Sequence, residues 1–511
     1  MNEPASMFAP TAFPDRFLEQ ARRRPTAPAL IWHGEEISYG DLDRMVRDSQ
    51  SYLKQFGPPT DCPVGILAKK SPQAISLILA AVIDRWSVLL PSVDLGRDTL
   101  LTLFEQAACG KVLSAGVDLT ASPIDLSSEF VGPAAVEDRG RPHASAGDAF
   151  LILTTSGSTG VPKIVPLSLL AIDRFMSWAG ARFGIDEDTA VLSFAPLNFD
   201  LCLLDIWTTL GRGGCVVLVD QERATNAQYL VDLLTANEVH VIQAVPMLYR
   251  LLVGVCREGG YRFESVRQVI ATGESISLPT LQALLALFPR ASFYNVYGST
   301  ETNDSFIHEI DMSRVGERHQ IPIGEPIDGV SALVVSDGDQ VVDGQGTGEL
   351  LVATPFQTQG YLTEGLNDTK FLSYSSGTDQ RTYFRTGDIV QRHGDGSITL
   401  EGRTDSYVKV RGVRISTEAV EQAILEHDEV VEVAVVAIPD DLAGKVLHAV
   451  VKRDGASRLN TLALRQNCAR ILDRAAIPSK MNITTTALPK TPNGKIDRVR
   501  SLAIQEEQKS D

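Results

Sequence analysis

Residues 153–163 read LTTSGSTGVPK, a short loop of glycines and hydroxyl side chains that follows the apolar run Ala149–Leu153. Successive backbone N–H groups, unobstructed at the glycines, can wrap a polyphosphate, and Ser and Thr hydroxyls add further donors. Lys163 supplies a compact positive charge. A Walker loop is excluded because proline precedes this lysine and isoleucine follows it. The segment predicts a phosphate-binding loop of another kind; a flexible Ser/Gly loop is the alternative for such a composition taken alone.

Short apolar runs alternate with longer amphipathic stretches on both sides of this loop. The runs that read as buried strands are Val64–Leu67, Ala149–Leu153, Val191–Phe194, Cys215–Val219, Val239–Ala244 and Val266–Ala271. Ala224–Ala236 and Leu278–Leu287 have helical spacing. This alternation predicts an α/β fold of layered subdomains with mainly parallel strands.

The pattern changes twice towards the C-terminus. From Val330 the strands are punctuated by Gly and Asp, which predicts a β-rich subdomain. A new α/β alternation begins near Tyr407, with helix-like Thr417–Glu426 and strand-like Val431–Ile438. The domain boundary is therefore expected in EGRTDS, residues 401–406.

Length and charge limit the possible classes of protein. A chain of 511 residues is too long for one compact core. The net charge of −17, from 64 acidic and 47 basic residues, disfavours nonspecific binding to nucleic acid or an anionic membrane. The six cysteines are scattered without a CxxC pair, so reduced thiols in the core are expected rather than disulfides or zinc.

The N-terminal segment MNEPASMFAPTAFPDRF has acids and prolines where a signal peptide needs basic residues and then an apolar run. The apolar stretch 77–90 is interrupted by Asp84 and Arg85, so it is too short to span a bilayer. We expect a soluble, cytoplasmic protein.

Three further clusters have side chains suited to binding a nucleotide. In YNVYGSTE, residues 294–301, an aromatic ring beside glycine offers a stacking face, and Glu301 is a hard oxygen ligand suited to Mg²⁺. In FRTGD, Asp388 follows a tight turn and could accept two ribose hydroxyls, although an Asp that caps its own turn is equally common. In LPKTPNGK, Lys495 follows a Pro/Gly-defined turn; taken alone, a solvated surface lysine is the simpler interpretation.

Taken in order, TTSGSTGVPK, NVYGSTE, GELLV, YFRTGD, GRTDSYVKVRGVRI and LPKTPNGKIDR resemble the signature motifs of the adenylate-forming superfamily. That superfamily includes acyl-CoA synthetases, luciferases and the adenylation domains of nonribosomal peptide synthetases. The forms VKVRG and NGKIDR are more similar to amino-acid-activating members, and FDLCLLDIW, residues 199–207, looks like the matching stretch of D-alanine–carrier protein ligases.

The resemblance implies an N-terminal adenylation core over residues 1–402, a hinge over 403–406 and a mobile α+β lid over 407–511. It also implies ATP and Mg²⁺ as ligands. Glu301 would bind the metal. The residues expected around ATP are Thr155, Ser156, Ser158, Thr159, Lys163, Asn295, Val296, Tyr297, Gly298, Ser299, Thr300, Asp388 and Arg403.

The same resemblance implies two reactions in one site. Lys495 would bridge the substrate carboxylate and the α-phosphate, because these anions repel and the transition state gains negative charge. The lid would then rotate at Asp405, withdraw Lys495 and bring Gly412 beside a phosphopantetheine thiol that displaces AMP.

Asp200 matches the acid that pairs with the substrate ammonium group in amino-acid-activating members; the alternative is a helix N-cap. By position, the side-chain pocket would consist of Leu201, Leu204, Gln243, Ile270, Thr272, Val296, Asp304 and Ser305. Its polar members argue against a purely aliphatic substrate. Serine, glycine or alanine with water, and a diamino or β-amino acid remain open, so a small or polar amino acid is expected.

Three substitutions depart from the common family pattern: Ser299 for proline, Ile164 for glycine and Trp86 for glycine. After Asp497 the sequence RVRSLAIQEEQKSD contains no carrier module, so a separate carrier protein is the expected acceptor, in natural-product biosynthesis. The alternatives are an acyl- or aryl-CoA ligase and a non-catalytic homologue acting as a binding subunit.

Overall fold

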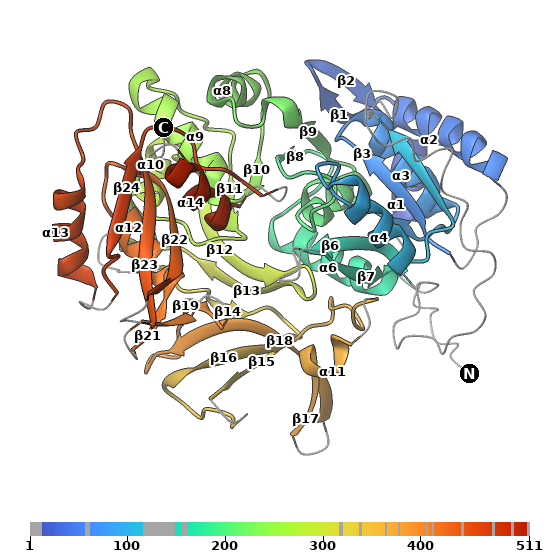
Figure 1. The fold of residues 1–511 in the computed structure, drawn as a ribbon. Coiled ribbons are helices and arrows are strands. Elements are labelled where there is room, and N and C mark those ends of the chain that lie inside the picture. Colours follow the sequence, from blue (N-terminus) through green and yellow to red (C-terminus); the bar gives the residue numbers. More distant parts are fainter. Residues whose placement is uncertain are drawn as a thin grey trace.

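The computed structural model describes residues 13–56, 62–115, 149–155, 162–315, 320–336, 340–362, 365–376, 379–404, 407–410, 413–440, 444–472, 476–491 and 495–507. Two α/β layers and a β-rich subdomain make up the part before the predicted hinge, and a smaller α/β unit follows it (Figure 1). This arrangement confirms the predicted fold class.

The largest sheet has nine strands in the order β14-β13-β12-β11-β10-β8-β9-β1-β2. Their bounds are β1 Pro28–Trp32, β2 Glu35–Ser38, β8 Ala190–Ser193, β9 Cys215–Leu218, β10 Val241–Ala244, β11 Gln268–Thr272, β12 Ser292–Ser299, β13 Asn303–Glu309 and β14 Glu325–Pro326. Pairing is parallel from β12 to β1 and antiparallel at both edges, so the predicted mainly parallel sheet is confirmed.

Period-two alternation along these strands gives the sheet two buried faces. Leu192, Ile242 and Ala271 pack on one face with helices α8 (Ala227–Ala236), α9 (Pro246–Gly259) and α10 (Leu278–Leu287). Val191, Val241 and Ile270 pack on the other face with α1 (Phe13–Arg23), α6 (Leu169–Arg182), the π-helical turn η3 (Leu203–Thr208) and α7 (Thr209–Arg212). The predicted pocket residues lie on this second face.

The predicted helix over Ala224–Ala236 is shorter in the structure. The side chain of Asn226 accepts a hydrogen bond from Tyr229 N, which starts α8 at Ala227, and the preceding residues form the 3₁₀ turn η4 (Gln221–Arg223). The helix predicted over Leu278–Leu287 has the same bounds in α10, where Ser277 is the N-cap and Pro279 occupies the first turn.

The second sheet has the order β5-β3-β4-β6-β7, and only its last pair is antiparallel. Its elements are α2 Tyr39–Leu53, η1 Lys54–Phe56, β3 Val64–Ala68, α3 Pro72–Ile83, β4 Val88–Leu89, α4 Arg97–Gln106, β5 Lys111–Ala115, β6 Ala149–Thr155 and β7 Lys163–Ser168. The predicted phosphate loop therefore connects two antiparallel strands, β6 and β7.

The β-rich subdomain predicted from Val330 is antiparallel throughout. It contains β15 Ser331–Val335, β16 Gly346–Ala353, α11 Asn367–Lys370, β17 Phe371–Ser376, β18 Asp379–Arg392 and β19 Ile398–Arg403. The C-terminal unit contains β20 Tyr407–Val410, β21 Val413–Ser416, α12 Thr417–Leu425, β22 Val430–Asp440, β23 Gly444–Arg453, α13 Thr461–Ile471, β24 Lys480–Thr484 and α14 Arg498–Glu507.

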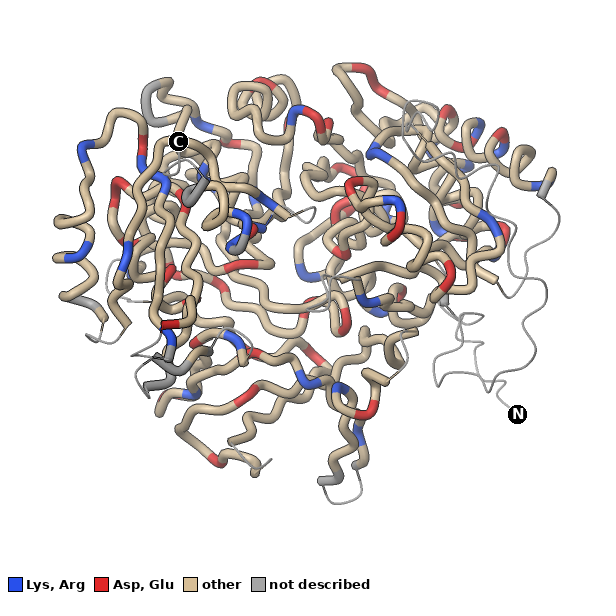
Figure 2. The backbone as a smooth tube through the Cα atoms, in the orientation of Figure 1, with Lys and Arg blue, Asp and Glu red and all other residues tan. Residues whose placement is uncertain are grey.

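Acidic and basic positions are interspersed through the described chain (Figure 2). None of the six cysteines forms a disulfide, and five are buried; Cys62 is exposed, so the expectation of a core thiol was wrong there. Among the described residues, no helix is long and apolar enough to cross a membrane.

Candidate active site

Asp388 is the centre of a hydrogen-bonded group at the end of the β-rich subdomain. Gly387 precedes it with φ +81°, a conformation that favours glycine, and places the carboxylate opposite Arg403 in the β18–β19 pair. Arg403 Nη1 lies 2.7 Å from Asp388 Oδ1, and the Tyr297 hydroxyl donates to Asp388 Oδ2. Burial raises the pKa of Asp388, while Arg403 and Tyr297 oppose that rise. Residues from three predicted motifs thus meet at one carboxylate.

The Tyr297 ring is partly buried and packs edge-on against Phe306, with 5.9 Å between ring centroids. The backbone beside it is close-packed, since a Cβ on Gly298 would lie 2.2 Å from Asn303 O. This glycine is therefore required for the turn between β12 and β13. The turn brings the following residues, Ser299, Thr300 and Glu301, to the edge of the same region.

Glu301 is 6% exposed, and its Oε1 accepts a hydrogen bond of 2.6 Å from the Tyr361 hydroxyl. Lys163 Nζ lies 5.3 Å from the centre of the Tyr361 ring. Tyr361 therefore joins the first residue of β7 to the predicted metal ligand. The sequence reasoning missed Tyr361, because a lone tyrosine sixty residues from Glu301 carries no local signal.

Lys370, at the end of α11, is a second residue that the sequence reasoning missed. Burial lowers the pKa of Lys370, and the charge of Lys163 lowers it further. Its Nζ donates to Arg385 O at 3.4 Å. Two lysines from separate elements thus lie within electrostatic reach of each other beside the predicted phosphate loop, where an anionic ligand would relieve their repulsion.

The side chains around Glu301 suit a magnesium ion that is bound to a nucleoside triphosphate. The described chain contains no group of three or more His, Cys, Asp or Glu side chains placed to hold a metal. Glu301 offers one nearly buried carboxylate close to the cationic side chain of Lys163. Mg²⁺ usually takes one or two protein carboxylates, with substrate phosphates and water as its other ligands. The Glu301 carboxylate, with Lys163 close by, is such a donor set.

Lys495 is exposed and lies near enough to Asp388 for its charge to lower the pKa of that acid, against the larger effect of burial. The backbone N–H of Thr491 donates to Lys495 O at 2.7 Å and holds this turn. Lys490 connects the turn to both parts of the chain: its Nζ lies 3.2 Å from Glu432 Oε1 and 3.1 Å from Met247 Sδ. The C-terminal unit therefore places Lys495 on the same side as Asp388, the residue predicted to bind ribose.

Asp200 is partly exposed and immediately precedes the turn that leads into η3. Burial of its carboxyl group raises its pKa, the Thr300 hydroxyl bonded to it lowers the pKa, and the charge of Glu301 raises it. The N-cap position of η3 is Cys202, and Leu203 N bonds the Asp200 carbonyl. Asp200 therefore lies two residues before the N-cap of η3, and its carboxylate lies beside Thr300 of the predicted nucleotide motif.

The other predicted pocket residues converge on the same side of the large sheet. Gln243 pairs with Ile270 and Thr272 pairs with Val296 in parallel register, so these four side chains share one face. Leu204, on η3, belongs to the apolar cluster on that face, and Leu201 is partly exposed beside it.

A bulge at Ser305 in β13 determines the placement of the last two predicted pocket residues, Asp304 and Ser305. Asp304 is 9% exposed, and burial followed by the charge of Asp200 raises its pKa to about 8. The Ser305 hydroxyl bonds Thr302 Oγ1 and Asn303 O, both at 3.1 Å. Asp304 is therefore the polar residue of this pair that lies within electrostatic reach of Asp200.

Two of the remaining predicted residues lie on described strands, and five lie outside the described residues. Thr155 ends β6 and pairs with Lys163. Asn295 lies on β12 and donates through Nδ2 to Pro322 O at 2.8 Å. Ser156, Ser158, Thr159, Asp405 and Gly412 lie outside the described residues.

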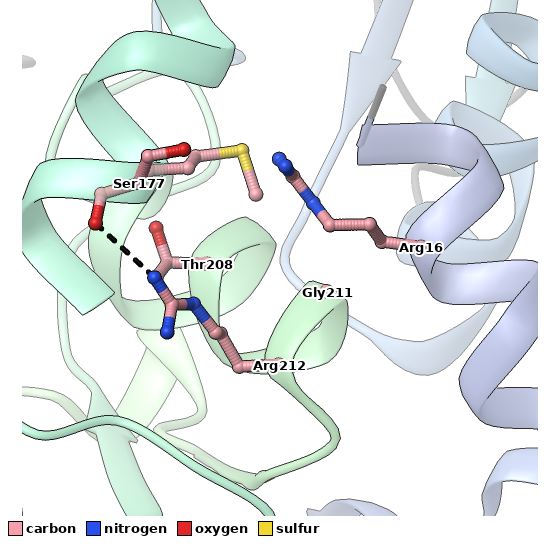
Figure 3. A pocket seen from close by; sticks show the side chains of 6 residues that line it. Arg16, Ser177, Thr208, Gly211 and Arg212 are labelled. Atoms are coloured by element: carbon pink, nitrogen blue, oxygen red, sulfur yellow. Dashed lines mark hydrogen bonds between the residues drawn. The ribbon is translucent and has the colours of Figure 1, made fainter. Parts of the chain in front are cut away.

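A separate small cavity lies between α1, α6, η3 and α7 (Figure 3). It is lined by Arg16, Met176, Ser177, Thr208, Gly211 and Arg212, none of which was predicted for the site. Its two guanidinium groups have protein partners: Arg16 lies 2.8 Å from Asp173 Oδ1, and Arg212 donates to Ser177 O at 3.1 Å. The cavity is not part of the nucleotide site.

The grouping of Lys163, Glu301, Asp388 and Lys495, which are predicted to bind phosphate, metal and ribose and to promote the reaction, is the one expected of an AMP-forming enzyme. The chain belongs to the AMP-binding enzyme family, which matches residues 17–362, and the AMP-binding enzyme C-terminal domain matches residues 419–495. It is 31% identical over 500 residues to an L-proline–[L-prolyl-carrier protein] ligase of Streptomyces coelicolor, with 92% of each chain covered.

A second ligase of the same name, from Pseudomonas fluorescens, is 29% identical over 522 residues, covering 96% of this chain and 99% of the relative. Among solved structures, NpsA of Klebsiella oxytoca in complex with 3-hydroxyanthranilyl-AMSN has a TM-score of 0.78 and 22% identity, over 98% of this chain and 100% of that one. At that identity the structural match supports the fold alone.

Proposed function

We propose that this chain adenylates a small or polar amino acid with ATP and transfers the aminoacyl group to the phosphopantetheine thiol of a separate carrier protein. The observation that carries the proposal is the position of Asp200, whose carboxylate contacts Thr300 and lies within electrostatic reach of Glu301. An acid next to the phosphate- and metal-binding motif is suited to bind the ammonium group of an amino acid whose carboxylate faces the α-phosphate. Two relatives of similar length are L-proline–[L-prolyl-carrier protein] ligases.

In the first half-reaction, a substrate carboxylate oxygen attacks the α-phosphorus, and the bond from that phosphorus to the pyrophosphate oxygen breaks. Lys495 would lie between the two anions and stabilise the negative charge that accumulates. Asp388 and Tyr297 would orient the ribose and the adenine ring, and Lys163 would bind phosphate. Magnesium held at Glu301 would neutralise charge on the departing pyrophosphate.

In the second half-reaction, the carrier thiol attacks the carbonyl carbon of the adenylate, the carbon–oxygen bond to AMP breaks, and the thiol loses its proton. Rotation of the lid at Asp405, with Gly412 beside the pantetheine arm, is part of this proposal. The proposal also includes the division into an adenylation core (residues 1–402), a hinge (403–406) and a lid (407–511). It further includes a cytoplasmic location, where ATP is available.

The proposal is tested by measuring ATP–pyrophosphate exchange with purified protein against proteinogenic, D- and β-amino acids and aryl acids. We expect exchange that depends on an amino acid and is lost in Lys495→Ala. Loading of the product is then followed by mass spectrometry on phosphopantetheinylated carrier protein, with coenzyme A as the competing acceptor. Exchange that responds to aryl or fatty acids and to no amino acid would instead identify a CoA ligase.

A further inference from the structure

Two acceptor atoms in the side-chain pocket are buried without a hydrogen-bond donor. They are Asp304 Oδ2 and Gln243 Oε1, and neither has a partner among the described residues. Asp304 is 9% exposed and Gln243 is 1% exposed. Buried polar atoms in folded proteins nearly always have partners, so an orphan acceptor in a pocket indicates that a ligand or water supplies the donor.

The two acceptors lie on different strands of the large sheet. Gln243 is on β10, three strands from β13. Asp304 is on β13, close enough to Asp200 for the charge of Asp200 to affect it. An amino acid held by its ammonium group at Asp200 would therefore have a short side chain within reach of Asp304.

The rest of the pocket favours a short substrate side chain. Leu204 and Ile270 are fully buried, and Val296 is 2% exposed. These apolar side chains offer no hydrogen bond, so the polar contact falls to an orphan acceptor, and Asp304 is the one that interacts with Asp200. A carboxyl group can bond a hydroxyl in either protonation state and can pair with an ammonium group when ionised.

We propose that the substrate is an amino acid with a short side chain ending in a hydroxyl or an ammonium group, which Asp304 binds. This inference rests on the proposed function. It separates the chain from the proline ligases that it resembles, because the proline ring has no side-chain donor and would leave the Asp304 carboxyl group desolvated and unpaired. Sites built to bond a polar group discriminate strongly against analogues that lack it.

The test compares isosteric pairs by kcat/KM in ATP–pyrophosphate exchange: L-serine with L-2-aminobutyrate, and L-2,4-diaminobutyrate with L-norvaline, with L-alanine and L-proline alongside. We expect one donor-bearing member to exceed its isostere and proline by about 10²-fold or more. Proline or an apolar isostere reacting as well as both donors would overturn the inference and leave the proposed function standing. Exchange with no amino acid at all would overturn both.

Two variants distinguish the hydroxyl from the ammonium group. Asp304→Val removes the acceptor at similar size, and we expect it to lower activity with the preferred substrate by about 10²-fold and to raise activity with its isostere. Asp304→Asn keeps a carbonyl acceptor without the charge, so it should retain much activity with a hydroxyl substrate and lose it with a diamino substrate. Unchanged preference in both variants would overturn the assignment of Asp304; ATP binding and a thermal melt check that each variant is folded.

Discussion

Arg403 Nη1 lies 2.7 Å from Asp388 Oδ1, and this contact joins the last strand before the hinge to the acid expected to bind ribose. The other carboxylate oxygen accepts the Tyr297 hydroxyl. Both oxygens therefore have protein donors in the ligand-free chain. A ribose that binds Asp388 must share or replace these donors, so nucleotide affinity depends on the groups that position the carboxylate.

The first prediction concerns Tyr297. Tyr297→Phe removes the hydroxyl donor and keeps the ring, so we expect the KM for ATP to change less than about fivefold. Tyr297→Ala also removes the stacking face, which is worth roughly 1–3 kcal/mol for a base on an aromatic ring, and should raise the KM at least tenfold. Initial rates of pyrophosphate exchange at varied ATP measure both. Equal effects of the two substitutions would show that the ring does not contact adenine.

Arg403→Gln is expected to change the pH dependence of ATP binding. Burial raises the pKa of Asp388 and Arg403 opposes this, so loss of the guanidinium raises the pKa further. Ribose hydroxyls donate best to the ionised acid. As pH falls, the KM for ATP should therefore begin to rise at a higher pH in Arg403→Gln than in the parent chain. Arg403→Lys, which keeps the charge, is the control, and superimposable profiles for the parent and Arg403→Gln would contradict the coupling.

Asp200→Ala should abolish the selection of amino acids. Removing a carboxylate that pairs with a buried ammonium group costs about 3–5 kcal/mol, which corresponds to a loss of roughly 10²–10⁴-fold in kcat/KM for the amino acid. The affinity for ATP, measured by calorimetry without an amino acid, should stay within about threefold. Unchanged exchange would refute the ammonium-binding role of Asp200.

Lys495→Ala and Gly412→Leu should affect different half-reactions. Loss of Lys495 should slow adenylation by about 10²–10³-fold, since one preorganised cation in the transition state is removed. Gly412→Leu should spare pyrophosphate exchange and block thioester formation, because a bulky side chain would fill the path of the pantetheine arm. Pyrophosphate exchange and carrier loading are measured in parallel. Equal loss of both activities in Gly412→Leu would contradict the rotating lid.

Asp304→Asn should make the ligand-free protein more stable at alkaline pH. The pKa of Asp304 is about 8 in the folded chain and near 3.8 when unfolded, so between these values the folded state holds the extra proton. The contribution of Asp304 to the stability of the parent chain therefore falls as pH rises from about 4 to 8, whereas the amide does not titrate. We expect the variant to gain roughly 1–3 kcal/mol at pH 8 and nothing near pH 4. Thermal melts at both pH values measure the stability of the variant and the parent chain. A stability difference that does not change with pH would contradict the prediction.

Much of the architecture follows from local patterns in the sequence. Parallel strands buried on both faces read as continuous apolar runs, which is why β9 and β11 were predicted within two residues of their bounds. Helix α10 matched in full because Ser277 and Pro279 mark its start. The bounds of α8 were less accurate, since Asn226 competes with the apolar pattern as a cap.

The sequence by itself determined the identity of the chemical groups: the phosphate-loop lysine, the acids and the terminal lysine stand in motifs whose order is fixed along the chain. Only the tertiary structure decided which of these groups lie close enough for the charge of one to affect another. Tyr361 meets Glu301 across sixty residues, and Asp304 comes within reach of Asp200 across about a hundred. Such contacts depend on sheet register and on a bulge in β13, and local sequence cannot encode the pairing of distant strands.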